Sequence, residues 1–410
     1  MRRILAIILS LVLVLVFTGC GGKTTTVAPS TPSSSVESNV SDDTVVLEPQ
    51  VWYSTDGVTL TKTDLEKAIN AEYVKPKNVI VMISDGMGLN DLKLTYEFSD
   101  FLFDYGLTFD KFANIGEAIT NNISGEVTDS AASATALATG VKTRNGRIGR
   151  TEKGKDLKNA LELARENGKK VGIVTNDAIY GATPSAFAVH NLSRENTAAI
   201  CRSFIECAPD VVLAGGYSSF GTVIGGSEKY RELIKGINVA SGFEIWQDKL
   251  NSDLKLEKPF FGFFNTDFSS EDYKLAQATE VALKRLKNDN GFFLMVEGAG
   301  CDKGGHGNNA EQKVASVAVF DKAVAVAVKF CLENPDTVLI VTSDHETGGV
   351  TIPSGKYELN SDIFTSESHT GVNVGVFALG YGTEYFKGKT VDNTDIGKFI
   401  HAAIKGETYK

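Results

Sequence analysis

Three acidic residues, Asp85, Glu297 and Asp344, stand where continuous apolar segments end. Short, unbroken apolar runs are typical of buried parallel strands, whose carboxyl ends lie along one edge of a sheet. Ligands of open α/β sheets bind beyond that edge. Carboxylates that converge there repel one another unless a cation lies among them. A single acid at a strand end is more often a helix cap, but three of them predict a metal site.

Three of the five histidines lie beside an acid or in a glycine-rich segment. His345 directly follows Asp344, and His369 lies in SESHTGVNVG, just ahead of an apolar run. His306 lies four residues after Asp302 in CDKGGHGNN, where we expect the glycines to let a turn fold back so that both side chains share a metal. Histidines in such settings are poor core residues and good zinc ligands.

The other histidines and the cysteines show no such pattern. His190 and His401 lack acidic, glycine-rich neighbours, and we expect both to be hydrogen-bonded structural residues. The four cysteines that follow Cys20 have no CxxC spacing, which disfavours a zinc–thiolate site. Cys201 and Cys207 could form a disulfide if the chain bends between them, and on one straight helix they would face apart.

Ser130 stands at the start of a run of good helix formers, AASATALATG, which ends at Gly140. A serine here lies among free backbone N–H groups at the positive end of the helix dipole, where phosphate is also bound. One interpretation is that Ser130 only caps the helix. The other is that it is a nucleophile, which needs a base or a metal. The GxSxG pattern is absent around Ser130 and no Ser-His-Asp set is evident, so a metal is the expected activator.

The apolar runs alternate with helical patterns, as at 155–168 and 311–334. Strands that alternate with helices favour an α/β fold, a three-layer sandwich with a largely parallel central sheet covered by helices on both faces. We find no internal repeat. The runs predicted to be buried parallel strands are 78–84, 170–175, 210–216, 291–298, 337–344 and 374–380.

The N-terminus has the features of an export signal. Residues 1–20 carry two arginines, then an apolar stretch from Ile4 to Phe17 that is short for a membrane span of about 20 residues. Thr18-Gly19-Cys20 resembles the lipobox of bacterial lipoproteins, although Phe17 replaces the usual leucine. The signal predicts lipidation at Cys20 on the extracytoplasmic side of the membrane. An uncleaved anchor is the alternative. Residues 21–43 are rich in Ser, Thr and Pro, which predicts a disordered tether.

Composition limits the partners. The chain has 410 residues, 42% of them hydrophobic, which supports one large α/β domain with a full core. Its net charge of −10 disfavours nucleic acid and anionic membrane surfaces. If the substrate is an anion, local positive charge must come from metals or from a few basic residues.

The chain resembles the alkaline phosphatases in several motifs. The segment VTDSAASATALATGVKT (127–143) is similar to the nucleophile motif of that family. Five other motifs occur in the family's order between about residues 76 and 375, and together they make the resemblance specific. They are MISDGMG (82–88), ATPSAFAVHNLSR (182–194), MVEGAGCDKGGH (295–306), VTSDHETGG (341–349) and SHTG (368–371).

The resemblance implies hydrolysis of phosphate monoesters through a phosphoserine on Ser130, with two Zn²⁺ and one Mg²⁺ as cofactors. It also implies a homodimer and a role in extracytoplasmic phosphate scavenging. The implied ligands are Asp302, His306 and His369 for one zinc, Asp85, Asp344, His345 and Ser130 for the second zinc, and Asp85, Thr183 and Glu297 for magnesium.

Three further residues are implied to act on the phosphate. Arg194 would bind two phosphate oxygens, Asp129 would orient Arg194, and Lys303 would lie near the phosphate through water. One position departs from the pattern, because Gly181 stands where many bacterial members have an aspartate. We therefore expect Lys303 to lack an ion-pair partner and magnesium to keep one more water.

The expected organisation is a catalytic domain over residues 76–410, preceded by an N-terminal arm at 44–75 and containing an insertion at 217–275. Only 23 residues separate His345 from His369, which predicts an open, shallow pocket and broad substrate choice.

Two other functions fit less well. Phosphodiesterases and nucleotide pyrophosphatases of the same superfamily usually lack the magnesium glutamate and the arginine, whereas Glu297, Thr183 and Arg194 are all present. A bidentate arginine also wants two free phosphate oxygens, which favours a monoester. A phosphate-capturing lipoprotein without catalysis would need neither the serine nor the metals.

Overall fold

The computed structural model describes residues 51–54, 58–98, 106–242, 258–264 and 274–410. The predicted signal peptide and tether, including Cys20, lie outside the described residues. Within these ranges, no helix combines the length and the apolar character needed to cross a membrane.

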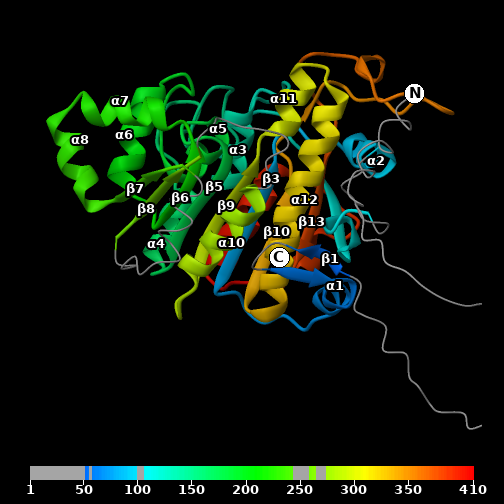
Figure 1. The fold of residues 1–410 in the computed structure, drawn as a ribbon, viewed down its shortest axis with the longest axis horizontal. Coiled ribbons are helices and arrows are strands. Elements are labelled where there is room, and N and C mark those ends of the chain that lie inside the picture. Colours follow the sequence, from blue (N-terminus) through cyan, green and yellow to red (C-terminus); the bar gives the residue numbers. More distant parts are fainter. Residues whose placement is uncertain (1–50, 55–57, 99–105, 243–257, 265–273) are drawn as a thin grey trace, which may run out of the picture. The chain divides into compact units, whose positions relative to one another are not determined.

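A ten-stranded sheet forms the middle layer (Figure 1). All of its pairings are parallel except those of β13, which runs antiparallel to both of its neighbours, β10 and β4. In spatial order the strands are β14 (Thr390–Asp392), β4 (Asn114–Ile119), β13 (Val374–Leu379), β10 (Thr337–Thr342), β3 (Asn78–Ser84), β9 (Phe292–Gly298), β5 (Lys170–Ala178), β6 (Val211–Gly215), β8 (Phe260–Phe263) and β7 (Asn238–Ser241).

Helices cover both faces of this sheet, which confirms the predicted three-layer α/β sandwich (Figure 1). Along β3, Val79, Val81 and Ile83 belong to one core and Ile80 and Met82 to the other, as the alternation of side chains in a strand requires. The first face carries α3 (Ser130–Thr139), α4 (Ala160–Glu166), α5 (Ala182–Ala188), α6 (Thr197–Cys207) and α13 (Asn393–Ile404), and the second carries α1 (Lys62–Ile69), α10 (Lys274–Leu286) and α12 (Ala310–Glu333).

The smaller elements complete the described fold. A hairpin of β1 and β2 and a short ladder of β11 and β12 lie outside the main sheet. These elements are β1 (Val51–Ser54), β2 (Thr59–Thr61), β11 (Glu346–Thr347), β12 (His369–Thr370), α2 (Leu89–Phe98), α7 (Tyr217–Gly225), α8 (Glu228–Leu233), α11 (Gly300–His306) and the 3₁₀ turns η1 (Phe109–Lys111), η2 (Ile234–Gly236), η3 (Ser361–Ile363) and η4 (Thr383–Phe386).

All six predicted strands are present, but one prediction of direction is wrong. The run at 374–380 forms β13, which is antiparallel rather than parallel. A continuous apolar run shows only that both faces are buried, and β13 is buried along its whole length between two neighbours. The segment 217–275 supplies α7 and α8 and also the last two strands at one side of the sheet, β8 and the edge strand β7, so part of it belongs to the sheet.

The helix α3 consists mostly of small residues, and this allows it to pack closely. All ten of its residues are buried. A Cβ on Gly397 of α13 would lie 2.4 Å from the carbonyl oxygen of Ala136, so the two helices contact each other through their backbones. Asp129 caps the first turn by accepting from the Ala132 N–H, and Gly140 ends the helix with a left-handed φ of 72°.

His190 is a structural residue, as predicted. Its Nδ1 lies 2.8 Å from the carbonyl oxygen of Gly149, and its Nε2 lies 3.0 Å from the carboxylate of Glu162 on α4. Both neighbours accept hydrogen bonds, so the protonated ring can donate from both nitrogens. Burial lowers the pKa of His190, but the hydrogen bonds to Glu162 and Gly149 outweigh burial and the pKa is raised.

Replacing His190 with glutamine should therefore reduce the pH dependence of folding stability. The folded-state pKa lies above the unfolded value of about 6.5. The charged ring contributes fully below that pH, and its contribution is lost as pH rises through the folded-state pKa. In urea titrations the free energy of unfolding of the wild type should exceed that of His190→Gln most at pH 6, and the excess should shrink by pH 9.

His401→Gln is the matched control. The Nε2 of His401 lies 2.9 Å from the carbonyl oxygen of Ala138, and burial lowers the pKa of this ring. The wild type should consequently gain stability over His401→Gln as pH rises from 5 to 7, the opposite direction. A wild-type excess over His190→Gln that stays constant or grows with pH would show that the ring is neutral when folded.

Candidate active site

The three predicted strand-end acids come from three adjacent strands. β3 lies between β10 and β9, and it is followed at once by Asp85. Asp344 comes two residues after β10, and Glu297 is the penultimate residue of β9. Asp85, Asp344 and His345 offer donor atoms that all lie within 4.8 Å of one another, and all three residues are buried. Two of the three strand-end acids, Asp85 and Asp344, therefore converge as predicted, whereas Glu297 lies outside this group.

A second group of donors is formed by Asp302, His306 and His369, also within 4.8 Å of one another. The Oδ1 of Asp302 lies 3.4 Å from the Nε2 of each histidine. The expectation of a folded-back turn at 302–306 is wrong, because these residues belong to the helix α11. Asp302 and His306 meet because residues four apart lie on one face of a helix.

The glycines between them allow close packing instead of a turn. A Cβ on Gly305 would lie 2.6 Å from the carbonyl oxygen of Thr347, and one on Gly304 would lie 2.9 Å from the backbone nitrogen of Lys313. The helix α11 can therefore approach both the segment after His345 and the helix α12.

The second donor group fits a cation. The Nδ1 atoms of His306 and His369 lie 2.6 and 2.8 Å from the carbonyl oxygens of Glu367 and Thr128, so Nδ1 carries the proton in each ring. The two Nε2 atoms then present lone pairs to each other at 3.2 Å, beside the carboxylate of Asp302. Three electron-rich atoms directed at one point are the arrangement that a metal ion relieves.

The first donor group fits a cation as well. The Oδ1 of Asp85 and the Oδ2 of Asp344 are buried and accept no hydrogen bond from the described residues. Burial and the charge of Asp344 raise the pKa of Asp85, and burial and the charge of Asp302 raise the pKa of Asp344 to about 6. Burial and the charge of His369 lower the pKa of His345, which favours the neutral ring that binds metals.

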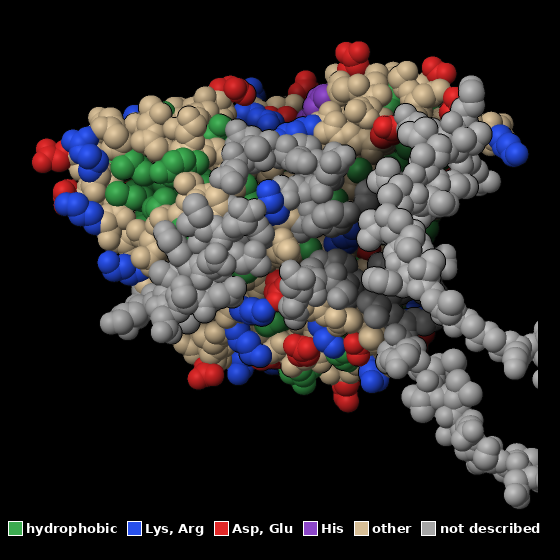
Figure 2. All heavy atoms as spheres, viewed as in Figure 1, with side chains coloured by type: hydrophobic (Ala, Val, Ile, Leu, Met, Phe, Trp, Pro, Cys, Tyr) green, Lys and Arg blue, Asp and Glu red, His purple; other side chains and the backbone are tan. Residues whose placement is uncertain are grey.

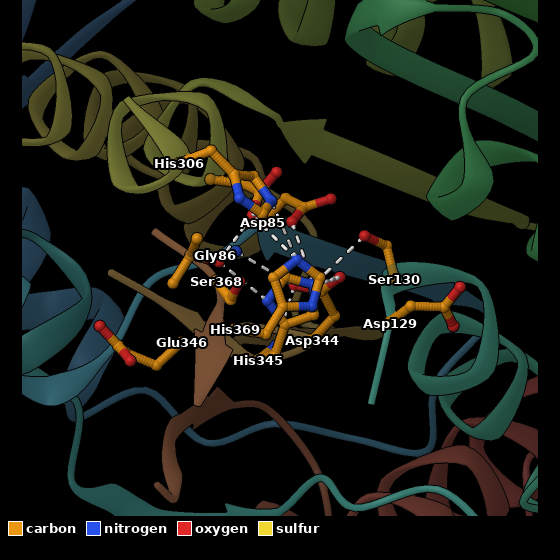
Figure 3. Close-up of polar contacts among 12 residues, drawn as sticks. Asp85, Gly86, Asp129, Ser130, His306, Asp344, His345, Glu346, Ser368 and His369 are labelled. Carbon is orange, nitrogen blue, oxygen red and sulfur yellow. Dashed lines mark hydrogen bonds and ion pairs between the residues drawn. The ribbon is translucent and has the colours of Figure 1, made fainter. Parts of the chain in front are cut away.

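Ser130 lies next to this first group (Figure 3). Its Oγ is 3.2 Å from the Nε2 of His345, and Figure 3 shows its side chain directed toward that ring while Asp129 points away. Asp129 is the residue that caps α3. The alternative that Ser130 serves as the cap is therefore wrong, since Ser130 is the first residue inside the helix and its hydroxyl is left for the site.

The second oxygen of Asp129 organises the arginine. Its Oδ2 accepts from the backbone N–H of Gly146 at 2.8 Å and from the Nη1 of Arg194 at 3.3 Å. The side chain of Arg194 is 34% exposed, so its guanidinium is held at one end and still accessible. The predicted link between Asp129 and Arg194 is present in the structure.

Of the predicted magnesium ligands, Thr183 contacts Asp85 directly. The Oγ1 of Thr183, in the first turn of α5, lies 3.4 Å from the Oδ2 of Asp85. Glu297 is buried and accepts a hydrogen bond from Thr175. Burial and the charge of Asp177 raise the pKa of Glu297 to about 8. Glu297 belongs to neither group of His and carboxylate donors found within the described residues.

The expectation that Lys303 lacks an ion-pair partner is wrong. Its Nζ lies 2.7 Å from the Oδ1 of Asp177, although position 181 is a glycine. Asp177 was missed by the sequence analysis. It lies near the carboxyl end of β5, and the strand-end rule that pointed to Asp85 could have found it.

Lys313 is a second residue that the sequence analysis missed. It is completely buried on α12 and pairs with the Oδ2 of Asp91 at 3.1 Å. Its Nζ also donates to the carbonyl oxygens of Gly86 at 3.2 Å and Thr347 at 2.6 Å. Lys313 thus joins the segment that follows Asp85 to the segment that follows His345.

The site reaches the surface beside α11. The side chain of His306 is 47% exposed. Figure 2 shows histidine side chains at the surface at the edge where Figure 1 places α11. A serine at a helix start, two donor groups for cations and an accessible arginine define a metal-dependent hydrolase of the α/β class that acts on an anionic group.

Comparison with known proteins identifies the family. The profile described as alkaline phosphatase matches residues 76–364. The chain is 34% identical over 326 residues to alkaline phosphatase 4 of Bacillus subtilis, which covers 72% of this chain and 67% of the relative. It is 28% identical to the alkaline phosphatase of Escherichia coli, over 80% of this chain and 86% of the relative. The chain belongs to the alkaline phosphatase family.

Solved structures agree with this assignment. The alkaline phosphatase from the Antarctic bacterium TAB5 superposes with a TM-score of 0.70 and 30% identity, over 82% of this chain and 99% of that one. A variant of that enzyme has been solved with Mg bound in its M3 site, with the same TM-score, identity and coverage. The predicted family, fold and enzyme class, a phosphoric monoester hydrolase, are confirmed, and metal binding is supported.

Replacing Lys313 alone with methionine should destabilise the protein by about 3–5 kcal/mol, because Asp91 would remain buried without its partner. The double variant Lys313→Met/Asp91→Leu should recover most of this loss, since apolar pairs often replace buried ion pairs without cost. Urea unfolding at fixed metal concentration measures both. If Lys313→Met is as stable as the wild type, the buried ion pair of Lys313 and Asp91 does not stabilise the fold.

Proposed function

We propose that the protein hydrolyses phosphate monoesters with Ser130 as the nucleophile. The observation that carries this proposal is the position of the Ser130 hydroxyl. It lies at the start of α3, is released from capping by Asp129, and is 3.2 Å from the Nε2 of His345 in the first donor group. Free N–H groups at the helix start favour a bound phosphate at the same point.

The donor groups support two zinc ions and one magnesium ion, because nitrogen and oxygen ligands suit zinc and oxygen ligands suit magnesium. When bound, these cations lower the pKa of the serine hydroxyl and stabilise charge on the leaving oxygen. The proposed ligands are Asp302, His306 and His369 for one zinc, Asp85, Asp344, His345 and Ser130 for the second zinc, and Asp85, Thr183 and Glu297 for magnesium.

In the proposed reaction, the Oγ of Ser130 attacks phosphorus in line with the departing alcohol oxygen. A bond from phosphorus to serine forms as the bond to the alcohol breaks. Arg194 binds two of the other phosphate oxygens, and Asp129 fixes its guanidinium at 3.3 Å. Water then cleaves the phosphoserine, which releases inorganic phosphate and restores Ser130. Lys303 lies near the phosphate and contacts it through water.

The same arginine supports a monoester as the substrate. A monoester has three phosphate oxygens without substituents, so two can bind the arginine while the third faces the donor groups, whereas a diester has only two for both contacts. The donor groups and the placed serine also favour catalysis over simple phosphate capture.

We further propose that the enzyme is exported, lipid-anchored at Cys20 and used for phosphate scavenging outside the cytoplasm. The signal at 1–20 and the tether at 21–43 support this location. The catalytic domain would span 76–410, with an arm at 44–75 and an insertion at 217–275.

Four exposed apolar side chains support the proposed homodimer. Ile115 and Ile119 on β4 are 36% and 42% exposed, and Val127 and Val372 are 44% and 53% exposed. A Cβ on Gly371 would lie 3.8 Å from Val127, so Val127 and the segment next to Val372 are neighbours. Apolar surface of this kind is typical of protein interfaces.

Ser130→Ala should lower kcat/KM for p-nitrophenyl phosphate by about 1,000-fold or more, because the variant lacks the hydroxyl that lies beside the first donor group. Acid quenching with a ³²P-labelled monoester should trap phosphoserine in the wild type and not in the variant. Ser124→Ala, in an exposed loop, is the control and should behave as wild type. Full turnover by Ser130→Ala would refute the assigned nucleophile.

Arg194→Ala should reduce monoester hydrolysis by about 100-fold, in kcat/KM, while hydrolysis of bis(p-nitrophenyl) phosphate changes much less. The reason is that a monoester keeps a third oxygen for the donor groups while two bind the guanidinium, whereas a diester has only two oxygens to share between both contacts. The ratio of monoester to diester rates, measured at saturating zinc and magnesium, reports this directly. Equal losses on both substrates would contradict a bidentate arginine.

A further inference from the structure

The ion pair between Lys303 and Asp177 joins two elements at the site. Lys303 follows Asp302 on α11, and Asp177 lies near the end of β5, more than a hundred residues earlier in the chain. Their side chains are 38% and 28% exposed and the two charged atoms are 2.7 Å apart. The end of β5, rather than the start of α5 at Gly181, therefore sets the position of the Lys303 ammonium.

Gly181 explains why Asp177 can reach this position. Its φ is −53°, which any residue adopts, so the backbone does not require glycine here. A Cβ at this position, however, would lie 3.1 Å from the Oδ2 of Asp177 and 3.1 Å from the carbonyl oxygen of Ala178. The carboxylate of Asp177 fills the space that a side chain at 181 would take.

Asp177 is also connected to the proposed magnesium subsite. Its backbone N–H donates to the Oγ1 of Thr175 at 2.9 Å, and Thr175 in turn donates to Glu297. The charge of Asp177 acts on the carboxyl of Glu297, and the charge of Lys303 acts on it with the opposite sign. These contacts place one acid, Asp177, between the lysine and the buried glutamate.

We propose that Asp177 is a positioning residue that holds Lys303 toward the phosphate and completes the acidic surroundings of the magnesium subsite. Gly181 leaves room for this carboxylate. An acid at position 177 or at position 181 would thus place its carboxylate in the same space, and in this chain the acid is Asp177. This inference rests on the proposed phosphomonoesterase function.

Variants that move the carboxylate from position 177 to position 181 test the inference. The variants are Asp177→Asn, Asp177→Ala, Gly181→Asp and the double variant Asp177→Ala/Gly181→Asp. Magnesium affinity is measured by equilibrium dialysis of the zinc-loaded protein, and kcat and KM for p-nitrophenyl phosphate are measured separately. Asp156→Asn is the control, because Asp156 forms a surface ion pair with Arg150 and its side chain is 56% exposed.

We expect Asp177→Asn and Asp177→Ala to weaken magnesium binding by about 10-fold or more, as is usual when a partner outside the ligand shell is lost. Their kcat should fall at low magnesium and recover at high magnesium. Gly181→Asp alone should also bind magnesium less well, since two carboxylates would crowd one space. The double variant should return to within about 3-fold of wild-type affinity if both sites serve one carboxylate.

Unchanged magnesium affinity in Asp177→Asn, or a double variant no better than Asp177→Ala, would overturn the inference. Thermal unfolding of each zinc-loaded variant identifies any that fail to fold, and the isosteric Asp177→Asn then decides. These results differ from a failure of the proposed function, which would appear as absent monoester turnover by the wild type with all metals supplied.

Discussion

Mutual repulsion among buried carboxylates is the constraint on which the site depends. Asp85 and Asp344 follow the ends of adjacent strands, and each has a buried oxygen that accepts no hydrogen bond from the part of the chain that the structure describes. Like charges in a low-dielectric interior are stable only when a cation or protons neutralise them. The raised pKa values of both acids express this cost. The fold holds the acids in place, and a bound cation would offset their repulsion by attracting both carboxylates.

The surrounding structure keeps these groups from relaxing apart. The small residues of α3 allow Ser133 to donate to the carbonyl oxygen of Asp344 at 2.7 Å, which fixes the segment carrying that acid. Lys313 joins the segments after Asp85 and His345 by donating hydrogen bonds to a backbone carbonyl oxygen in each. Asp129 caps α3 with one oxygen and orients Arg194 with the other. Asp129 thereby leaves the Ser130 hydroxyl free of a capping role and positions the arginine that would bind the substrate.

The sequence predicted those parts of the site that depend on residues close together in the chain. Continuous apolar runs identified β3, β9 and β10, and parallel strands necessarily bring their terminal acids to one edge. The direction of β13, the helical form of α11 and the pairing of Lys303 with Asp177 could not be predicted in this way. Each depends on a partner distant in sequence: two neighbouring strands, the backbone of Thr347, and the space beside Gly181.

The stability of the metal-free protein tests the role of charge repulsion most directly. Urea unfolding should be compared for wild type and Asp344→Asn, each with zinc and magnesium and after chelation. Without metal, Asp344→Asn should be more stable than the wild type at pH 8, because one buried charge is removed. With metal, the order should reverse, because a ligand is lost. A metal-free wild type more stable than metal-free Asp344→Asn would contradict repulsion as the organising constraint.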